Sequence, residues 1–400
     1  MEGMARLAVF VLAVATLAAD SATSEATETA GPLSPLVVDI VPQQSIVPVL
    51  GTDDRYHVLY ELQLTNTLGD AADLRSVEVL DPGGRKLLKL GAEDIIKGDY
   101  LHTLDRQMAT TTLFPAFEER VLILNLSFDS RSSIPREVTH RFEVSGAEPF
   151  NKHPTRFSYG GGLVKFSHLE PPALLPPLEG EGWLASDGCC GPTGHINALV
   201  GLNGKLQGAE RFAIDWIKID ADGRIFTGDK TDPKNWAGYG AKVLAVGSGV
   251  VTAARYDQQD HPPGTMPTDL PLSKLPGNYV MIAMEGNITA IYAHLKPGSI
   301  RIKVGDQVKA GELIGSVGNN GGSLAPHLHF HIVNGSDAVT SDGYPYVINS
   351  FALAATSEPS MLIKALEGEP AFPRRNPMSP VEHKRQLPLN LTIIDFPPGR

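Results

Sequence analysis

Glycine and proline interrupt this chain so often that long helices are disfavoured. The 400 residues include 40 glycines and 31 prolines. Short apolar stretches lie between them, and this combination favours strands joined by turns. The hydrophobic content of 42% and the charged content of 20% are ordinary for a folded globular protein. We therefore predict a mostly β fold.

The length predicts two folded units with appendages, at roughly 100–200 residues per domain. Residues 36–145 carry strand patterns such as YHVLYELQLTN and ERVLILNLSFD, which predict an immunoglobulin-like β-sandwich of unknown role. Residues 165–183 read as a Pro-rich linker, residues 184–352 as a second β-rich domain, and residues 353–400 as a Pro-rich, largely extended tail.

The N-terminus has the pattern of an export signal over residues 1–22. Arg6 precedes the apolar run LAVFVLAVATLAA, and small residues follow it. The run suits a signal-peptide core and is shorter than the roughly 20 apolar residues of a membrane helix, although an uncleaved anchor is the alternative. We expect an extracytoplasmic protein, periplasmic or secreted, with no membrane span in the mature chain.

The net charge of −11 bears on the choice of partner. An acidic protein is not attracted to a phosphate backbone or to anionic lipid, and no basic patch compensates. We therefore expect no nucleic-acid partner.

The two cysteines, Cys189 and Cys190, are adjacent. Neighbouring cysteines do not make a disulfide framework, and no CxxC spacing is present. A soft metal ligand is one interpretation of the pair, but packing or a disulfide between the two neighbours is favoured over it.

Three histidines alternate in the stretch APHLHFH. In a strand, His327, His329 and His331 would share one face while Leu328 and Phe330 pack on the other. Imidazole is a common zinc ligand and also titrates near neutrality, so one strand could supply both a metal ligand and an acid or base. A solvated polar face is the alternative. The HExxH zinc pattern is absent from the chain.

Two stretches resemble the lysostaphin-like (LytM-type) zinc metallopeptidase family. They are NALVGLNGKLQGAERFAIDW and TAIYAHLKPGSIRIKVGDQVKAGELIGSVGNNGGSLAPHLHFHIV, and the resemblance covers roughly residues 190–350. It implies a duplicated hybrid β-motif domain that binds Zn²⁺ and cuts peptide cross-links in bacterial cell walls. Carried over, it implies Asp215 and His329 as zinc ligands, with His294 and His327 as the catalytic pair beside the bound water.

The chain departs from the family pattern at Arg211. The family's HxxxD motif reads RFAID here, so an arginine stands where the first zinc-binding histidine is expected. A guanidinium has no acceptor atom and cannot bind zinc. Arg211 could instead pair with Asp215 and leave a metal-free site.

A replacement ligand is available in His195. It lies 16 residues before Arg211, with a turn signal at Asn203-Gly204 between them, so a hairpin could bring the two segments alongside each other. We predict His195, Asp215 and His329 as the metal ligands. His331 stands where the family commonly has Glu, and it is either a partner that orients a ligand or an ordinary polar contact.

Three functions fit these observations. The first is a secreted zinc endopeptidase acting on peptidoglycan or a similar peptide, with cell-envelope proteins as further partners. The second is a degenerate domain that binds the cell wall or activates another hydrolase. The third is a lipoyl-carrier-like hairpin domain, which IKVGDQVKAGELIGSVGN resembles, but it leaves the histidines unexplained.

Overall fold

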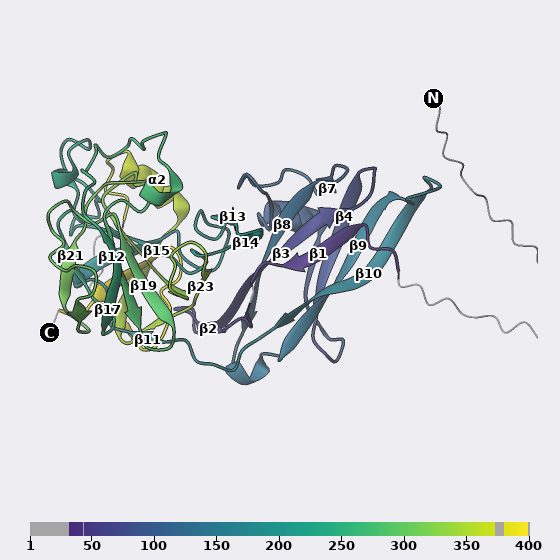
Figure 1. The fold of residues 1–400 in the computed structure, drawn as a ribbon, viewed down its shortest axis with the longest axis horizontal. Helices are drawn as coiled ribbons and strands as arrows, with labels where there is room; N and C mark the ends of the chain where they lie inside the picture. The colour runs from purple at the N-terminus through teal and green to yellow at the C-terminus, as the bar shows by residue number, and fades with distance from the viewer. Residues whose placement is uncertain (1–31, 43, 373–379, 399–400) are drawn as a thin grey trace, which may run out of the picture. The chain divides into compact units, whose positions relative to one another are not determined.

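Antiparallel β-strands dominate the chain, as its composition predicts (Figure 1). The computed structural model describes residues 32–42, 44–372 and 380–398. Within these ranges no helix is long and apolar enough to cross a bilayer. The predicted signal peptide, residues 1–22, lies outside the described residues. Residues from Leu33 onward belong to one compact unit.

The first half of the chain forms a sandwich of two antiparallel sheets. Its elements are β1 (Leu36–Ile40), β2 (Val49–Leu50), β3 (Tyr56–Asn66), β4 (Ala72–Leu80), β5 (Lys86–Gly91), α1 (Ala92–Lys97), β6 (Leu101–Thr103), β7 (Leu113–Phe114), β8 (Glu119–Phe128), β9 (Glu137–Ala147) and β10 (Pro154–Lys165). One sheet has the order β1-β3-β8-β6, with β2 beside β3. The other has the order β10-β9-β4-β5, with β7 beside β4. The sandwich thus continues to Lys165, beyond the predicted boundary at residue 145, because β10 completes the second sheet.

The β3–β8 sheet is buried on both faces. Tyr60 and Leu62 of β3 point into the core of the sandwich. Leu59 of β3 and Ile123 of β8 instead belong to the core of the C-terminal domain. Burying such side chains stabilises the fold by about 1.5–3 kcal/mol each. The sandwich is therefore packed against the C-terminal domain rather than held apart from it as a spacer.

The C-terminal domain is built on an 11-stranded sheet. Its elements are β11 (Ala173–Leu174), β12 (Gly180–Ser186), β13 (Val200–Leu202), β14 (Lys205–Gln207), β15 (Ile214–Lys218), β16 (Lys242–Leu244), β17 (Gly249–Arg255), β18 (Tyr279–Met284), β19 (Ile288–Ala293), β20 (Gln307–Val308), β21 (Leu313–Ser316), β22 (Leu328–Asn334), β23 (Asp342–Gly343), β24 (Val347–Ile348), β25 (Phe351–Thr356), α2 (Pro359–Leu366), β26 (Val381–His383) and β27 (Thr392–Phe396). The sheet order is β20-β17-β18-β19-β22-β15-β12-β27-β25-β26, with β23 beside β22.

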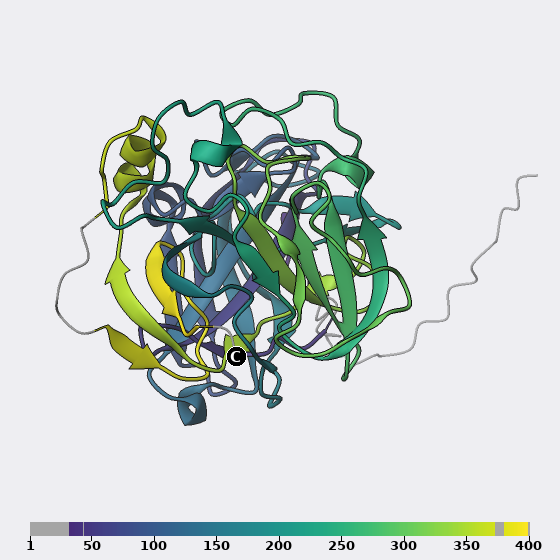
Figure 2. The same ribbon diagram turned by 90° about the vertical axis from the view of Figure 1, so that its left-hand side faces the viewer.

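Two further predicted boundaries are wrong. The Pro-rich stretch 165–183 contains β11 and the start of β12, so much of it belongs to the domain rather than to a linker. The expected tail, residues 353–400, supplies most of β25, all of α2, and β26 and β27, and Figure 2 shows the yellow end of the chain among the other strands. Buried apolar residues such as Ile394 and Phe396 hold it there despite its prolines.

The hairpin predicted at Asn203-Gly204 is present. β13 pairs with β14, with Leu202 opposite Lys205. Asn203 and Gly204 have φ values of 52° and 76°, as a two-residue turn between antiparallel strands requires. The hairpin reverses the chain between His195 and the strand that carries Asp215.

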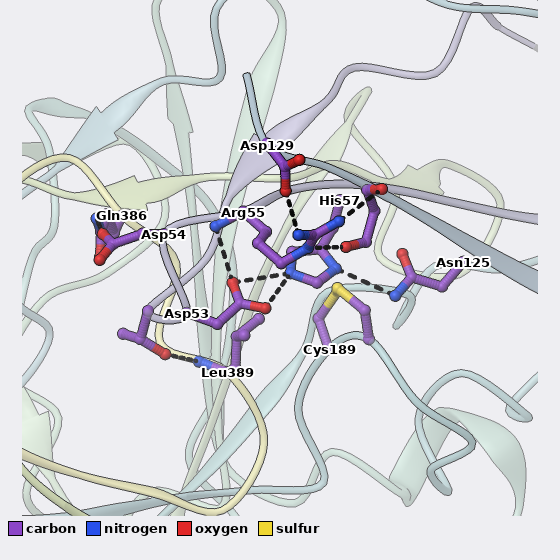
Figure 3. A network of polar contacts seen from close by, with 12 residues as sticks. Asp53, Asp54, Arg55, His57, Asn125, Asp129, Cys189, Gln386 and Leu389 are labelled. Carbon is purple, nitrogen blue, oxygen red and sulfur yellow. Dashed lines mark hydrogen bonds and ion pairs between the residues drawn. A yellow bond between two sulfur atoms is a disulfide. The ribbon is translucent and has the colours of Figure 1, made fainter. Parts of the chain in front are cut away.

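Polar contacts add to the packing between the sandwich and the C-terminal domain (Figure 3). The backbone N–H of Leu387 donates to Leu50 O at 2.8 Å, and Leu387 O accepts from the N–H of Thr52 at 3.2 Å. Gln386 Nε2 donates to Asp54 Oδ1 at 2.7 Å. Residues close to the end of the chain therefore hold the turn that follows β2.

A buried histidine in the sandwich should make folding stability depend on pH. His140 Nδ1 donates to Gly162 O at 2.7 Å, and Nε2 accepts from the Tyr60 hydroxyl at 2.9 Å. Burial lowers the pKa of His140 to about 4. The unfolded chain therefore binds a proton below pH ~6.5 that the folded chain refuses until about pH 4.

We expect the free energy of unfolding to fall as pH falls from 6.5 to 4, with His140 contributing up to about 3 kcal/mol of that loss. His140→Gln cannot titrate, so its free energy of unfolding should vary less steeply over this window, whatever its absolute stability. Urea unfolding at several pH values measures both slopes. Equal slopes for the variant and the wild type would contradict the assignment.

Candidate metal centre

Strand β22 presents the alternating histidines as predicted. Leu328 and Phe330 are fully buried in the core, while His329 and His331 project from the opposite face. His327 immediately precedes the strand and lies near the same group of side chains, with its Nε2 3.3 Å from Asp215 Oδ1. One short segment thus delivers three imidazoles to one place.

The neighbours of β22 bring the next two residues. Asp215 of β15 lies directly opposite His329, and its Oδ1 is 3.0 Å from His329 Nδ1. On the other side, Ala293 of β19 is opposite His329, so His294 follows at the end of that strand. Side chains directly opposite in antiparallel strands lie close together. Antiparallel register alone therefore gathers these residues.

His195 reaches the same carboxylate from the turn before β13. Its Nε2 is 3.4 Å from Asp215 Oδ1, and its ring lies edge-on to His329 with centroids 4.7 Å apart. Its Nδ1 donates to the carbonyl of Asp187 at 2.9 Å, which leaves Nε2 facing the cluster. The potential ligand atoms of His195, Asp215 and His329 all lie within 4.8 Å of one another.

Arg211 points away from this cluster. Its guanidinium binds Glu61 of the sandwich, with Nε 2.8 Å and 3.1 Å from the two carboxylate oxygens. The alternative in which Arg211 pairs with Asp215 is therefore wrong. The physical reason is a second buried carboxylate, which the sandwich supplies on the other side of the arginine.

The rings of His294 and His327 lie side by side, with centroids 4.8 Å apart. His294 Nδ1 donates to Asn320 O at 2.8 Å, and His327 Nδ1 donates to Ala325 O at 2.7 Å. Each ring therefore presents its Nε2 for proton exchange, and Nε2 of His327 lies 3.3 Å from Asp215 Oδ1. His294 has φ 61°, a left-handed backbone conformation. Residues other than glycine rarely adopt this conformation, and those that do are concentrated at functional sites.

Sequence reasoning missed the group that holds His294 in place. Asp260 Oδ1 accepts from the Asn320 side chain at 2.7 Å and from the backbone N–H of Asn319 at 2.8 Å. Asn320 in turn offers its carbonyl to His294. Asp260 lies in the long loop between β17 and β18, and only the length of that loop signalled a role in the site.

His331 lies directly behind His329. Its Nδ1 is 2.9 Å from His329 Nε2. A proton on His329 Nε2 donated to His331 leaves His329 Nδ1 as the acceptor that faces Asp215. Within the described residues, His331 Nε2 is buried and has no hydrogen-bond partner. The geometry is that of a partner orienting a ligand, one of the two alternatives for this residue.

The charges around Asp215 favour a cation. Burial alone would raise the pKa of Asp215, but the neighbouring His327 and His195 rings lower it well below its usual range. Burial opposes protonation of His195, yet Asp215, with Glu210 and Asp187, raises the pKa of that ring to about 10. Burial, with the charges of His327 and His329, keeps the pKa of His294 well below its usual value. Asp215 is therefore ionised, and protons on His195 and His327 carry the positive charge that balances it, so a bound cation would take the place of those protons.

The donor set fits a divalent metal. Two imidazole nitrogens and one carboxylate oxygen are a usual ligand set for catalytic zinc, which needs three protein ligands and an open position. Contacts with Asp187 and His331 hold one ring nitrogen of His195 and of His329, so that His195 presents Nε2 and His329 presents Nδ1 to Asp215. A bound metal would take the place of the protons that these side chains share.

The cysteines do not belong to this donor set. Cys189 and Cys190 are joined to each other as a disulfide. Figure 3 shows the disulfide beside His57 of the sandwich, and the two cysteines line a cavity together with that residue. A disulfide has no thiolate, so the interpretation of the pair as a soft metal ligand is wrong.

The fold and the site together define a class of protein, a β-rich domain with a buried His/Asp/His cluster that could hold a metal ion. Residues 235–341 match the model of peptidase family M23. This chain therefore contains an M23 domain, and the predicted lysostaphin-like resemblance is confirmed. The matched range includes His294, His327 and His329, but it begins after His195 and Asp215.

Three relatives are similar to short parts of this chain. Over 97 residues the chain is 33% identical to the peptidoglycan DD-endopeptidase ShyC of Vibrio cholerae, covering 24% of this chain and 18% of the relative. Over 74 residues it is 42% identical to lysostaphin of Staphylococcus simulans, covering 18% and 15%. Over 93 residues it is 33% identical to an uncharacterized metalloprotease of Buchnera aphidicola, covering 23% and 20%. The chain thus spans a fifth or less of these relatives.

Substituting His195 tests its place in the donor set. We expect His195→Ala to weaken zinc binding by more than about 100-fold, beyond the 10–100-fold typical of residues that only orient a ligand. Zinc content and chelator competition on the purified protein measure the change. His153→Ala is the matched control, because His153 is exposed and far from the cluster in sequence. Unchanged zinc affinity in His195→Ala would remove the residue from the site.

Proposed function

We propose that this chain is a zinc metalloendopeptidase that hydrolyses peptide cross-links of peptidoglycan or a similar peptide. The observation that carries the proposal is the convergence of His195, Asp215 and His329, with their ligand atoms within 4.8 Å. The M23 match supports a peptidase, and the similarity to a peptidoglycan DD-endopeptidase supports the substrate.

Zinc held by these three side chains would polarise the scissile carbonyl and lower the pKa of water toward 7. The chain's own contribution is to move protons. His294 and His327 present Nε2, because Nδ1 of each ring is fixed by a backbone carbonyl. One ring can accept the proton of the attacking water and return it to the leaving amine, while the other donates to the developing oxyanion. Attack by water needs no covalent intermediate.

Such an enzyme would work outside the cytoplasm, in the periplasm or after release, where its substrate is found. Cell-envelope proteins are its expected partners, and residues 1–22 are its expected signal peptide. The alternative of a non-catalytic wall-binding domain depended on Arg211 occupying the metal position. That arginine is instead paired with Glu61, which supports the catalytic proposal over the alternative.

Substitutions should distinguish the catalytic pair from the metal ligands. His294→Ala and His327→Ala should each lower the rate of peptidoglycan hydrolysis by about 10²–10⁴-fold, the usual range for acid–base groups, while keeping bound zinc. His329→Ala should lose both zinc and activity. Release of soluble peptide fragments from purified cell walls measures activity, and metal analysis measures zinc.

A chelator should abolish hydrolysis, and added zinc should restore it. His153→Ala should behave like the wild type. A wild-type protein that carries one zinc yet leaves peptidoglycan and short glycine-containing peptides intact would reject the proposed reaction.

A further inference from the structure

One buried ion pair connects the sandwich to the segment that carries Asp215. The Glu61 side chain is 0% exposed and that of Arg211 is 3% exposed. In addition to the two contacts of Nε, Arg211 Nη2 donates to Glu61 Oε2 at 2.8 Å. The planar fork of a guanidinium matches a carboxylate in this way, so the pair fixes orientation as well as distance.

The same guanidinium also reaches β23. Arg211 Nη1 donates to Gly343 O at 3.3 Å, and Nη2 is 3.7 Å from Asp342 Oδ1. β23 is paired with the end of β22, with Gly343 opposite Val333. Arg211 therefore touches the sandwich at Glu61 and, through β23, the strand that carries His329.

Arg211 is also close in sequence to the metal cluster. Asp215 follows it by four residues, and the segment between them is buried and turned by a hydrogen bond from Ala213 N to Glu210 O at 2.9 Å. Glu210 Oε1 lies 3.9 Å from His329 Nε2. A shift of Arg211 would therefore move Asp215 relative to His329.

Glu61 lies among apolar side chains. Its neighbours on the outer side of the sheet include Leu59 and Ile123, which belong to the core of the C-terminal domain. Burying a carboxylate there costs desolvation energy, and a buried ion pair commonly stabilises a fold no better than apolar residues would. Setting the register of packed elements is the best-attested use of such a pair.

We propose that Glu61 of the sandwich is a positioning residue for the metal centre. Through Arg211 it sets β15 against β22, so that Asp215 and His329 keep the spacing that metal binding needs. The sandwich is then part of the catalytic unit, and Arg211, which stands at a family ligand position, anchors that unit instead of binding metal. This inference rests on the proposed function.

The test is metal binding by the full chain carrying Glu61→Gln. We expect zinc affinity, measured by competition with a chelator, to fall about tenfold or more, as it does when residues that orient ligands are changed. We also expect the visible absorption of bound Co²⁺ to change, since it reports ligand geometry. Glu78→Gln is the matched control. It neutralises a buried glutamate whose partners Lys86, Lys89 and Arg141 all lie within the sandwich, and it should bind zinc like the wild type.

Thermal unfolding of each variant separates positioning from stability. A lower melting temperature for Glu61→Gln with zinc affinity and Co²⁺ absorption unchanged would overturn the proposal, because the pair would then serve stability alone. Arg211→Lys keeps the buried charges but loses the fork, so it should fold even if Glu61→Gln does not. We expect a weaker zinc affinity in Arg211→Lys as well, and an unchanged affinity would equally overturn the proposal.

Zinc binding by the wild-type protein distinguishes failure of the proposed function from failure of the positioning role of Glu61. A wild-type protein that binds no zinc defeats the proposed function itself. A wild-type protein that binds zinc, with variants that bind it equally well, defeats only the positioning role of Glu61.

Discussion

The antiparallel register of β19, β22 and β15 is the constraint on which the site depends. His329 lies opposite Asp215 on one side and Ala293 on the other, and no other register gathers the same side chains. A slip of one residue would turn every histidine of β22 into the core. Burial of Leu328 and Phe330 on the opposite face prevents that slip. Packing of apolar side chains on one face of the sheet thus fixes the positions of the metal-site side chains on the other face.

The sequence predicted the part of the site that follows from local periodicity. The alternation of His327, His329 and His331 needs only the two-residue repeat of a strand. His195 could also be predicted, because the Asn203-Gly204 turn indicates that the chain reverses direction between His195 and Arg211. Its exact approach could not be derived, since His195 lies in a turn beyond the short hairpin and is held there by the carbonyl of Asp187.

Contacts between distant segments were beyond such reasoning. Asp260 sits in a loop without periodicity, and its link to His294 runs through the backbone of Asn320. The pairing of Glu61 with Arg211 joins residues 150 positions apart. The stretch ERVLILNLSFD does indicate that its strand is packed on both sides, because apolar residues occur at successive positions, as in a strand buried on both faces. Pattern alone could not show what covers the second face.

The position of β27 has a consequence for how the protein is made. This strand lies between β12 and β25 inside the large sheet, yet it is formed by residues near the end of the chain. While the chain is being synthesised, β12 has no partner on that side, and the gap closes only when Thr392–Phe396 become available. Pairing across more than 200 residues is slow compared with local folding. The C-terminal domain therefore cannot complete its large sheet until Thr392–Phe396 have been synthesised.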